Sequence, residues 1–308
     1  MDLSRKIKDE AGRLGFDICG IAKTRPLDQD RQVMKNWIDS GMNAEMKYLE
    51  RDLDKRSNPV CLFPGARSLV VTGTSYNTRI KQHNEGVPVI SKYAYGRDYH
   101  IVIREKLEAL LTSIQAWMPG IRGKAVVDSS PVLEKAWALE AGIGWRGKHS
   151  VIINRSIGSF FFIGILILDR DLEYDTPLPG DICGNCRLCI DNCPTGAINE
   201  NRTIDARKCI ANLTIENRDP IPEEIVPKLS GRVYGCDRCQ EVCPWNEWVK
   251  QHDHTELMPD ERIINLDRTG WLNLSEEEFY RLFKATAMNR VNYGQFVRNL
   301  HDALKSLS

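Results

Sequence analysis

Eight of the ten cysteines in this 308-residue chain lie between Cys183 and Cys243, at spacings that suit iron–sulfur clusters. Four of them form a run with a trailing proline, Cys183-x2-Cys186-x2-Cys189-x3-Cys193-Pro194. In bacterial ferredoxins this run gives three thiolates to one [4Fe-4S] cluster and its fourth thiolate to another. The run therefore predicts a two-cluster module that carries single electrons.

The remaining thiolates of such a module follow downstream. They are Cys209 and the run Cys236-x2-Cys239-x3-Cys243-Pro244. By the crossing rule we assign Cys183, Cys186, Cys189 and Cys243 to one cluster, and Cys193, Cys209, Cys236 and Cys239 to the other. A pair of zinc sites is the alternative, since C-x2-C pairs suit zinc, but zinc needs neither the interleaving nor a continuous run of four. Cys19 and Cys61 are predicted to be small buried hydrophobic residues.

The first half of the chain offers fewer chemical groups. Asp128 follows a predicted strand and is either a helix cap or an acid-base group. Gly142-Ile-Gly144-Trp-Arg-Gly147 matches G-x-G-x-x-G, but it follows a helix and precedes a strand, which excludes a dinucleotide fingerprint. The loop is then either a turn or a place of close contact with a flat cofactor. The triplet Asp98-Tyr99-His100 begins a helix, and its likeness to a corrinoid-binding signature is interpreted as accidental.

The elements that position these groups alternate between helix and strand. Hydrophobic periodicity predicts helices at 3–14, 26–39, 98–117 and 131–141, and strands at 17–22, 68–74 and 124–127. Two further strands, 150–154 and 160–168, are expected to pair with each other. The acidic, proline-rich stretch 169–181 marks a boundary, so we predict domains at 1–178, 179–250 and 251–308. The last becomes helical from Ser275, whose spacing to Glu278 fits a capping box, and stays helical to Leu307.

Composition and charge narrow the class of protein. The chain has 42 Lys and Arg residues and 42 Asp and Glu residues. This balance excludes a polybasic arm as the main means of binding a partner. No apolar run approaches the ~18 residues that a membrane span needs, and the N-terminus lacks a signal sequence, so we expect a cytoplasmic protein with no membrane contact. Residues 51–106 carry ten Lys and Arg against five Asp and Glu, with tyrosines between them. This favours an RNA-binding surface, and an ordinary solvated surface is the alternative.

Several motifs together resemble one family. DKRSNP (54–59), YGRDYH (95–100), VVDSSPVLEKAWALEAGIGWRGKHS (126–150) and the eight cysteines are similar to epoxyqueuosine reductases, over nearly the whole chain. The resemblance implies an α+β fold: a nitroreductase-like, cobalamin-processing-like α/β domain, then a ferredoxin-like module with two [4Fe-4S] clusters, then a short helical segment without long repeats. It implies an oxidoreductase that reduces the epoxide of epoxyqueuosine at the tRNA wobble position, with cobalamin as second cofactor. Its partners would be the tRNA anticodon loop and an unidentified low-potential electron donor, and the chain would be a monomer.

The resemblance also implies roles for single residues. Asp128 would be the proton donor, which requires a carboxyl pKa raised by burial or by neighbours. Arg56, Tyr95, His149, Ser150 and Ile152 would line the corrinoid. Ser91 would stand beside the cobalt, where some members of the family carry a cysteine.

Two other functions remain open from the residues. One is a corrinoid iron–sulfur reductase of a small molecule, similar to reductive dehalogenases. The other is an electron-transfer or cobalamin-carrier protein without catalysis of its own. Turnover of modified tRNA separates these three possibilities.

Overall fold

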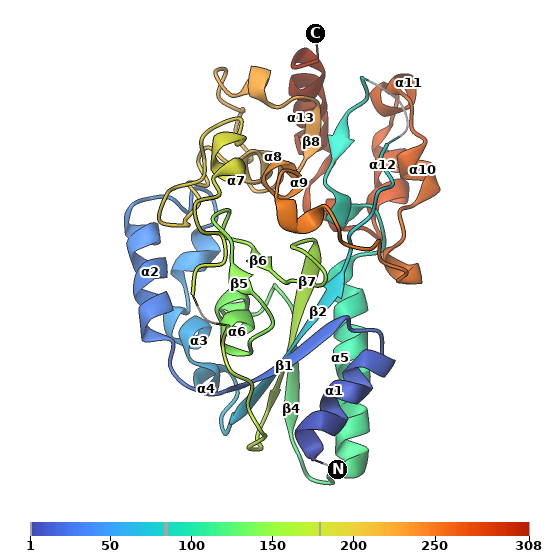
Figure 1. Cartoon of the computed structure of the whole chain (residues 1–308). Helices are drawn as coiled ribbons and strands as arrows, with labels where there is room; N and C mark the ends of the chain where they lie inside the picture. Colours follow the sequence, from blue (N-terminus) through green and yellow to red (C-terminus); the bar gives the residue numbers. More distant parts are fainter. Residues whose placement is uncertain (1, 83–85, 179, 308) are drawn as a thin grey trace.

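The computed structural model describes residues 2–82, 86–178 and 180–307 (Figure 1). The strands are β1 (Ile18–Lys23), β2 (Ser68–Ser75), β3 (Val89–Ile90), β4 (Gly123–Val126), β5 (Trp145–Arg146), β6 (Ile152–Ile153), β7 (Phe161–Leu168) and β8 (Arg232–Tyr234). The helices of the first half are α1 (Leu3–Arg13), α2 (Asp28–Asp39), α3 (Leu53–Ser57), α4 (Pro59–Leu62), α5 (Tyr99–Trp117) and α6 (Glu134–Glu140). Those of the second half are α7 (Leu188–Asp191), α8 (Ile210–Ile215), α9 (Arg238–Glu241), α10 (Glu261–Ile264), α11 (Arg268–Leu272), α12 (Glu276–Phe283) and α13 (Tyr293–Lys305).

An antiparallel sheet in the order β1-β2-β7-β4 forms the centre of the N-terminal half. Its two middle strands are buried along almost their whole length because helices cover both faces of the sheet, and β7 reads as a near-continuous apolar run. Alternate side chains of β7 point to opposite faces, so Phe162 and Leu166 join one core while Ile165 and Ile167 join another. Helices α1 and α5 pack on the first face and α6 on the second (Figure 1).

The expected pairing of 150–154 with 160–168 is wrong. Strand β6 pairs with β5 instead, through Trp145 with Ile153 and Arg146 with Ile152. The loop between them turns tightly enough for this hairpin because Ser150 adopts a left-handed φ of 64° and donates its N–H to the Gly147 carbonyl. Strand β7 is then free to lie between β2 and β4.

The C-terminal segment builds a core of its own together with an earlier part of the chain. Trp271, Phe279, Phe283 and Phe296 are fully buried in this core, and so are Ile90 and Ala94. Strand β3 of that earlier part of the chain pairs in parallel with β8 of the cysteine module. This second core therefore joins the N-terminal half to the cysteine module (Figure 1).

The C-terminal helices differ from the expected single stretch. The capping box of Ser275 and Glu278 is confirmed. However, α10 and α11 precede it, and a 3-10 turn at Ala287–Arg290 separates α12 from α13. Across 2–82, 86–178 and 180–307, no helix is long and apolar enough to cross a membrane.

The two cysteines outside the module differ from each other. Cys19 is half-buried and packs against the core beside α1, as expected of a small hydrophobic residue. The expectation that Cys61 is buried is wrong, because it lies on α4, a single surface turn that buries only Pro59.

Candidate active site

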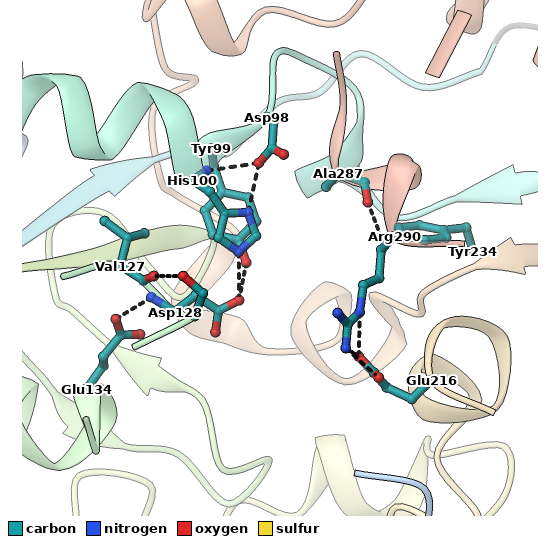
Figure 2. A network of polar contacts seen from close by, with 11 residues as sticks. Asp98, Tyr99, His100, Val127, Asp128, Glu134, Glu216, Tyr234, Ala287 and Arg290 are labelled. Carbon is teal, nitrogen blue, oxygen red and sulfur yellow. Dashed lines mark hydrogen bonds and ion pairs between the residues drawn. The ribbon is translucent and has the colours of Figure 1, made fainter. Parts of the chain in front are cut away.

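Asp128 lies two residues beyond β4 and meets the N-terminus of α5. The Tyr99 hydroxyl donates to Asp128 Oδ2 over 2.6 Å, and His100 Nε2 lies 3.1 Å from the same oxygen. On its other side, His100 Nδ1 lies 2.8 Å from Oδ1 of Asp98, which caps α5 by accepting from the His100 N–H. The result is a chain Asp98–His100–Asp128 with Tyr99 as a further donor (Figure 2). The Asp128 side chain is 58% exposed, so one end of this chain faces open space.

The proton in this network lies on histidine rather than on aspartate. Burial lowers the pKa of His100, but its bonds to Asp128 and Asp98 raise it more, to about 9 overall. Burial raises the pKa of Asp128, but the bonds from His100 and Tyr99 bring it below its ordinary value. The expectation of a raised Asp128 pKa is therefore wrong, because two donors stabilise the carboxylate. At neutral pH the pair is an imidazolium facing a carboxylate, and it holds one shared proton.

Glu134 supports Asp128 from the first turn of α6. The Asp128 backbone N–H donates to Glu134 Oε1 over 2.5 Å. This contact holds Asp128 at a φ of 45°, a left-handed conformation that is costly for a residue other than glycine. Burial and the negative charge of Asp128 raise the pKa of Glu134 to about 8. Glu134 thus stores a second proton next to the Asp128 loop.

Lys135 connects this network to the cysteine module. The Lys135 side chain is exposed. Desolvation and the positive charge of Arg146 nevertheless lower its pKa, while the charges of Asp128, Glu134 and Cys239 act in the opposite direction. Lys135 in turn acts on His149 and on Cys209. The charge of one ammonium group therefore acts both on Asp128 and on the module.

Figure 2 also shows a second group of polar side chains, on the opposite side of the picture from Asp128. Arg290 donates two bonds to Glu216 Oε1 and one to Oε2, the last over 2.8 Å. Its guanidinium carbon lies 5.8 Å from the ring centre of Tyr48, which is 43% exposed. Burial raises the pKa of Tyr48, and the charges of Glu216, Arg290, Asp128 and Arg56 all reach its hydroxyl. Tyr48 therefore lies beside Arg290, and the charge of Asp128 also acts on it.

Arg56, expected to line a corrinoid, belongs to the same space. Its guanidinium donates to the carbonyls of Arg51 and Tyr48. Its own carbonyl accepts from the Leu133 N–H, which ties α3 to the loop that carries Asp128. The structure thus places Arg56 on a helix that is bonded to the segment following Asp128.

The eight clustered cysteines come together in two sets of four. Cys243 interacts electrostatically with Cys183, Cys186 and Cys189, and we call these four the distal set. Cys239 interacts with Cys193, Cys209 and Cys236, and we call these four the inner set. The sets are the ones that the crossing rule assigns.

The loop after β5 presents a buried histidine with a free donor. His149 is 2% exposed, and its Nδ1 accepts from the Val151 N–H over 3.2 Å. Within the described part of the chain Nε2 has no partner. Burial and the charge of Lys135 lower the pKa of His149 to about 4, so the ring is neutral and carries its hydrogen on Nε2. Beside it Ser150 is half-buried and Ile152 fully buried.

The glycines of this loop serve backbone packing. A Cβ at Gly144 would lie 2.4 Å from the Ile153 carbonyl oxygen, and one at Gly147 would lie 2.7 Å from the His149 ring. Both positions therefore need glycine in order to close the hairpin around His149. The segment Gly142–Gly147 follows α6 and includes β5, so it does not open a helix, in keeping with its rejection as a dinucleotide fingerprint.

Ser91 and Tyr95 lie apart from Asp128. They line a cavity of about 310 Å³ together with Lys92, Gly235, Cys236 and Asp237, and neither Asp128 nor Arg56 reaches its wall. The Lys92 N–H donates to Asp237 Oδ2 over 2.8 Å, and burial raises the pKa of Asp237 to about 6. The residues expected around the corrinoid therefore lie in three places. Ser91 and Tyr95 line this cavity, His149, Ser150 and Ile152 lie in and next to the loop after β5, and Arg56 lies on α3.

The donor groups present suit the expected cofactors. Two sets of four thiols match two clusters, and the unpartnered His149 Nε2–H would be satisfied by an acceptor of a large amide-rich cofactor. Sequence reasoning missed Tyr99, His100, Glu134, Glu216 and Arg290. The only signal for the first two was the triplet at the start of α5, which we interpreted as accidental.

Comparisons with known proteins find matches to both halves of this chain. Residues 182–246 match the model of a 4Fe-4S double cluster binding domain, and residues 56–129 match the model described as epoxyqueuosine reductase QueG, DUF1730. An epoxyqueuosine reductase of Cyclobacterium marinum is 40% identical over 296 residues, which cover 96% of this chain and 94% of that protein.

Two solved structures are also similar to this chain over nearly its whole length. A crystal structure of an epoxyqueuosine reductase with an epoxyqueuosine-modified tRNA-Tyr stem loop aligns with a TM-score of 0.92 at 30% identity, over 99% of this chain and 81% of that one. The Bacillus subtilis epoxyqueuosine reductase, solved with its catalytic aspartate loop swung out of the active site, aligns with a TM-score of 0.91 at 30% identity, over 99% of this chain and 82% of that one.

Proposed function

This chain belongs to the epoxyqueuosine reductase family, and on that basis we propose that it reduces the epoxide of epoxyqueuosine in tRNA to the alkene of queuosine. The reaction consumes two electrons and two protons and releases water. The enzyme is an oxidoreductase. The observation that carries the proposal is the proton-holding pair Asp128–His100, whose carboxylate end is exposed.

We propose that the distal and inner sets hold one [4Fe-4S] cluster each. The double-cluster domain match over 182–246 supports two such clusters. The charge of Lys135 acts on Asp128 and also on Cys209 and Cys239 of the inner set, so we propose that the inner set is the nearer one to Asp128. Electrons would therefore enter at the distal set and leave from the inner set. Their donor would be a low-potential one-electron carrier.

Cobalamin is the proposed acceptor of these electrons, and when bound it supplies a strongly reducing, nucleophilic cobalt centre. Among the chain's own residues, His149 would offer its Nε2–H to a cofactor acceptor, and Ser150 and Ile152 would complete the loop beneath it. Arg56 would line the opposite side, and Ser91 and Tyr95 the adjoining cavity. The N-terminal sheet with its helices would be the nitroreductase-like scaffold for this site.

Asp128 and His100 would together supply the proton. Opening an epoxide develops negative charge on its oxygen, and an acid within hydrogen-bond reach is needed to neutralise it. Asp128 is the exposed end of the pair, and His100 recharges it through the 3.1 Å contact. The raised pKa of His100, about 9, keeps one proton on the pair at physiological pH.

The group around Tyr48 would receive the modified nucleoside. Proteins read single-stranded RNA loops by stacking bases on aromatic rings and on guanidinium planes. Tyr48 and Arg290 offer both kinds of surface, and Glu216 fixes the guanidinium. Because tRNA is the proposed substrate, we place the reaction in the cytoplasm.

Asp128→Asn tests the proposal with the least disturbance. The amide keeps the shape of the side chain but cannot pass a proton from His100 to the substrate. We expect both clusters and cobalamin binding to persist while turnover of epoxyqueuosine tRNA falls by about 10²-fold or more. Near-normal turnover would remove Asp128 from the reaction. Turnover by the wild type of a small corrinoid-reductase substrate, with no conversion of tRNA, would replace the proposed function by the small-molecule alternative.

A further inference from the structure

The last helix of the chain, α13, closes the end of α8 with three of its side chains. The carbonyls in the last turn of a helix receive no bond from the helix itself and need donors from elsewhere. In α8 each of the last three accepts from a different side chain of α13, over 2.7–3.1 Å. These pairs are Leu213 with Arg298, Thr214 with Asn299, and Ile215 with Gln295. Helix α13 therefore fixes the place where α8 ends and the next turn begins.

Gln295 holds the residues on both sides of Glu216. Its Nε2 donates to the Ile215 carbonyl over 2.9 Å and to the Asn217 carbonyl over 3.0 Å. The side chain is 6% exposed, and among the described residues its Oε1 has no partner. A buried amide oxygen without a partner is unfavourable, so this amide contributes through the bonds that it donates. Because one nitrogen bonds the carbonyl before Glu216 and the carbonyl after it, Gln295 fixes the direction of the backbone at Glu216.

The carboxylate of Glu216 in turn fixes Arg290 (Figure 2). It accepts three bonds from the guanidinium, over 2.8–3.2 Å, and the guanidinium carbon lies 5.8 Å from the ring centre of Tyr48. Two residues after Glu216, Arg218 donates from its Nη2 to the Arg290 carbonyl over 3.3 Å. The turn 216–218 therefore holds Arg290 both at its side chain and at its backbone.

Arg290 is also joined to α13 directly along the chain. Only Val291 and Asn292 lie between Arg290 and the first residue of α13. Val291 is buried, and Asn292 caps α13 by accepting from the Gln295 N–H over 2.8 Å. Gln295 therefore supports the pair of Glu216 and Arg290 at two points. Its side chain bonds the residues that flank Glu216, and its backbone bonds the cap that follows Arg290.

We infer that Gln295 is a positioning residue for RNA binding, which acts through Glu216 on Arg290. The inference rests on the proposed function, because it takes a nucleoside of the anticodon loop as the ligand of Arg290 and Tyr48. A guanidinium stacks on a base only when its plane is held against that base, and ordering a mobile arginine on binding costs conformational entropy. Gln295 removes part of this cost by keeping Glu216 in place before the RNA arrives. Its loss should weaken RNA binding and leave the chemical step unchanged, because the proton-holding pair stands on other elements, α5 and the loop after β4.

The test measures RNA binding and turnover separately with the reconstituted full-length enzyme. The RNA is a fluorescently labelled anticodon stem loop that carries epoxyqueuosine. Its Kd is measured by fluorescence anisotropy, and its conversion is measured under single-turnover conditions with saturating enzyme. Gln295→Met keeps the length of the side chain but has no donor, Gln295→Asn keeps an amide that is too short to bridge the two carbonyls, and Arg290→Ala removes the guanidinium. Asn77→Leu is the matched control, because Asn77 is also a 6% exposed amide that donates to two carbonyls, those of Val249 and Lys250.

We expect Gln295→Met to raise the Kd about fivefold and Arg290→Ala to raise it about tenfold or more. Gln295→Asn should change the Kd in the same direction as Gln295→Met. In both Gln295 variants the single-turnover rate, the iron content and cobalamin binding should stay at the wild-type level. When Arg290 is already alanine, adding Gln295→Met should raise the Kd less than about twofold, because residues that act through one another are not additive. Asn77→Leu should lower the thermal stability and leave the Kd unchanged.

An unchanged Kd in the Gln295 variants would overturn the inference. So would a rise in Kd that persists in full when Arg290 is already alanine, or a loss of turnover at saturating enzyme in place of RNA affinity. A wild-type enzyme that neither binds nor converts the modified stem loop would instead contradict the proposed function. The two failures are therefore distinguishable in one set of assays.

Discussion

The substitution Asp98→Asn would test directly how the proton is held in the site. Asp98 accepts from both the backbone N–H and Nδ1 of His100, the latter over 2.8 Å. Asparagine is an equally good N-cap, so α5 should keep its start, and the amide oxygen can still accept from the imidazole. Only the negative charge behind His100 is removed.

The expected effect follows from the pKa of His100. Its rise from 6.5 to about 9 corresponds to about 3 kcal/mol at 1.36 kcal/mol per unit. Asp128 and Asp98 both contribute to it, and the ring is one-third exposed, so solvent screening reduces the share of each. We therefore expect the loss of one charge to lower the pKa of His100 by about one unit, to roughly 8.

The assay is the pH dependence of single-turnover epoxide reduction, measured anaerobically. His100 is active when protonated, so the rate should hold at low pH and fall as the pH rises through the pKa of His100 in the folded enzyme. For the wild type this decline is expected near pH 9. For Asp98→Asn it should begin about one unit lower, which makes the variant about fivefold slower at pH 9 and equal to wild type near pH 6.5.

A matched control separates this effect from a change in helix capping. Asp267 caps α11 through the Gly270 N–H and has no part in the site, so Asp267→Asn should leave the pH profile unchanged. The reasoning would be refuted if the alkaline decline of Asp98→Asn stayed near pH 9. It would also be refuted if the variant lost the same fraction of activity at every pH.

Three further predictions concern the loop, the corrinoid side and the clusters. Glu134→Ala should lower turnover about tenfold or more, because the strained φ of Asp128 loses its support, whereas Glu134→Gln keeps an acceptor oxygen and should retain most activity; equal losses would contradict a positioning role. His149→Phe should weaken cobalamin binding about tenfold in a spectroscopic titration while iron content stays the same, and unchanged affinity would remove His149 from the cofactor site. Cys209→Ser should reduce the iron content after reconstitution from about eight to about four atoms per chain, whereas Cys61→Ser should leave it unchanged; loss of both clusters would argue against independent sets.

Local patterns were enough to predict much of this molecule. The spacing of the cysteines divides them into the two sets that the structure brings together, because cluster ligation is a local geometric demand on the chain. Hydrophobic periodicity located α5 and β7 to within a residue or two. The capping box of Ser275 was visible because both of its members lie in a single turn.

Features that depend on long-range contacts could not be predicted from the sequence. His100 and Asp128 are 28 residues apart and meet only because α5 packs on the sheet beside the end of β4. Glu216 and Arg290 are 74 residues apart, and nothing in either segment indicates the other. The pKa of Asp128 was predicted with the wrong sign for the same reason, since its two donors were not recognised as neighbours.

The most direct test of the account is a reaction with the enzyme's proposed substrate. The purified chain would be reconstituted anaerobically with iron, sulfide and cobalamin, and incubated with epoxyqueuosine-containing tRNA and a strong reductant. The nucleosides would then be analysed by mass spectrometry. The account predicts the loss of one oxygen from the modified nucleoside, only when cobalamin is present. Unchanged nucleoside from an enzyme that holds about eight irons and retains cobalamin would contradict it.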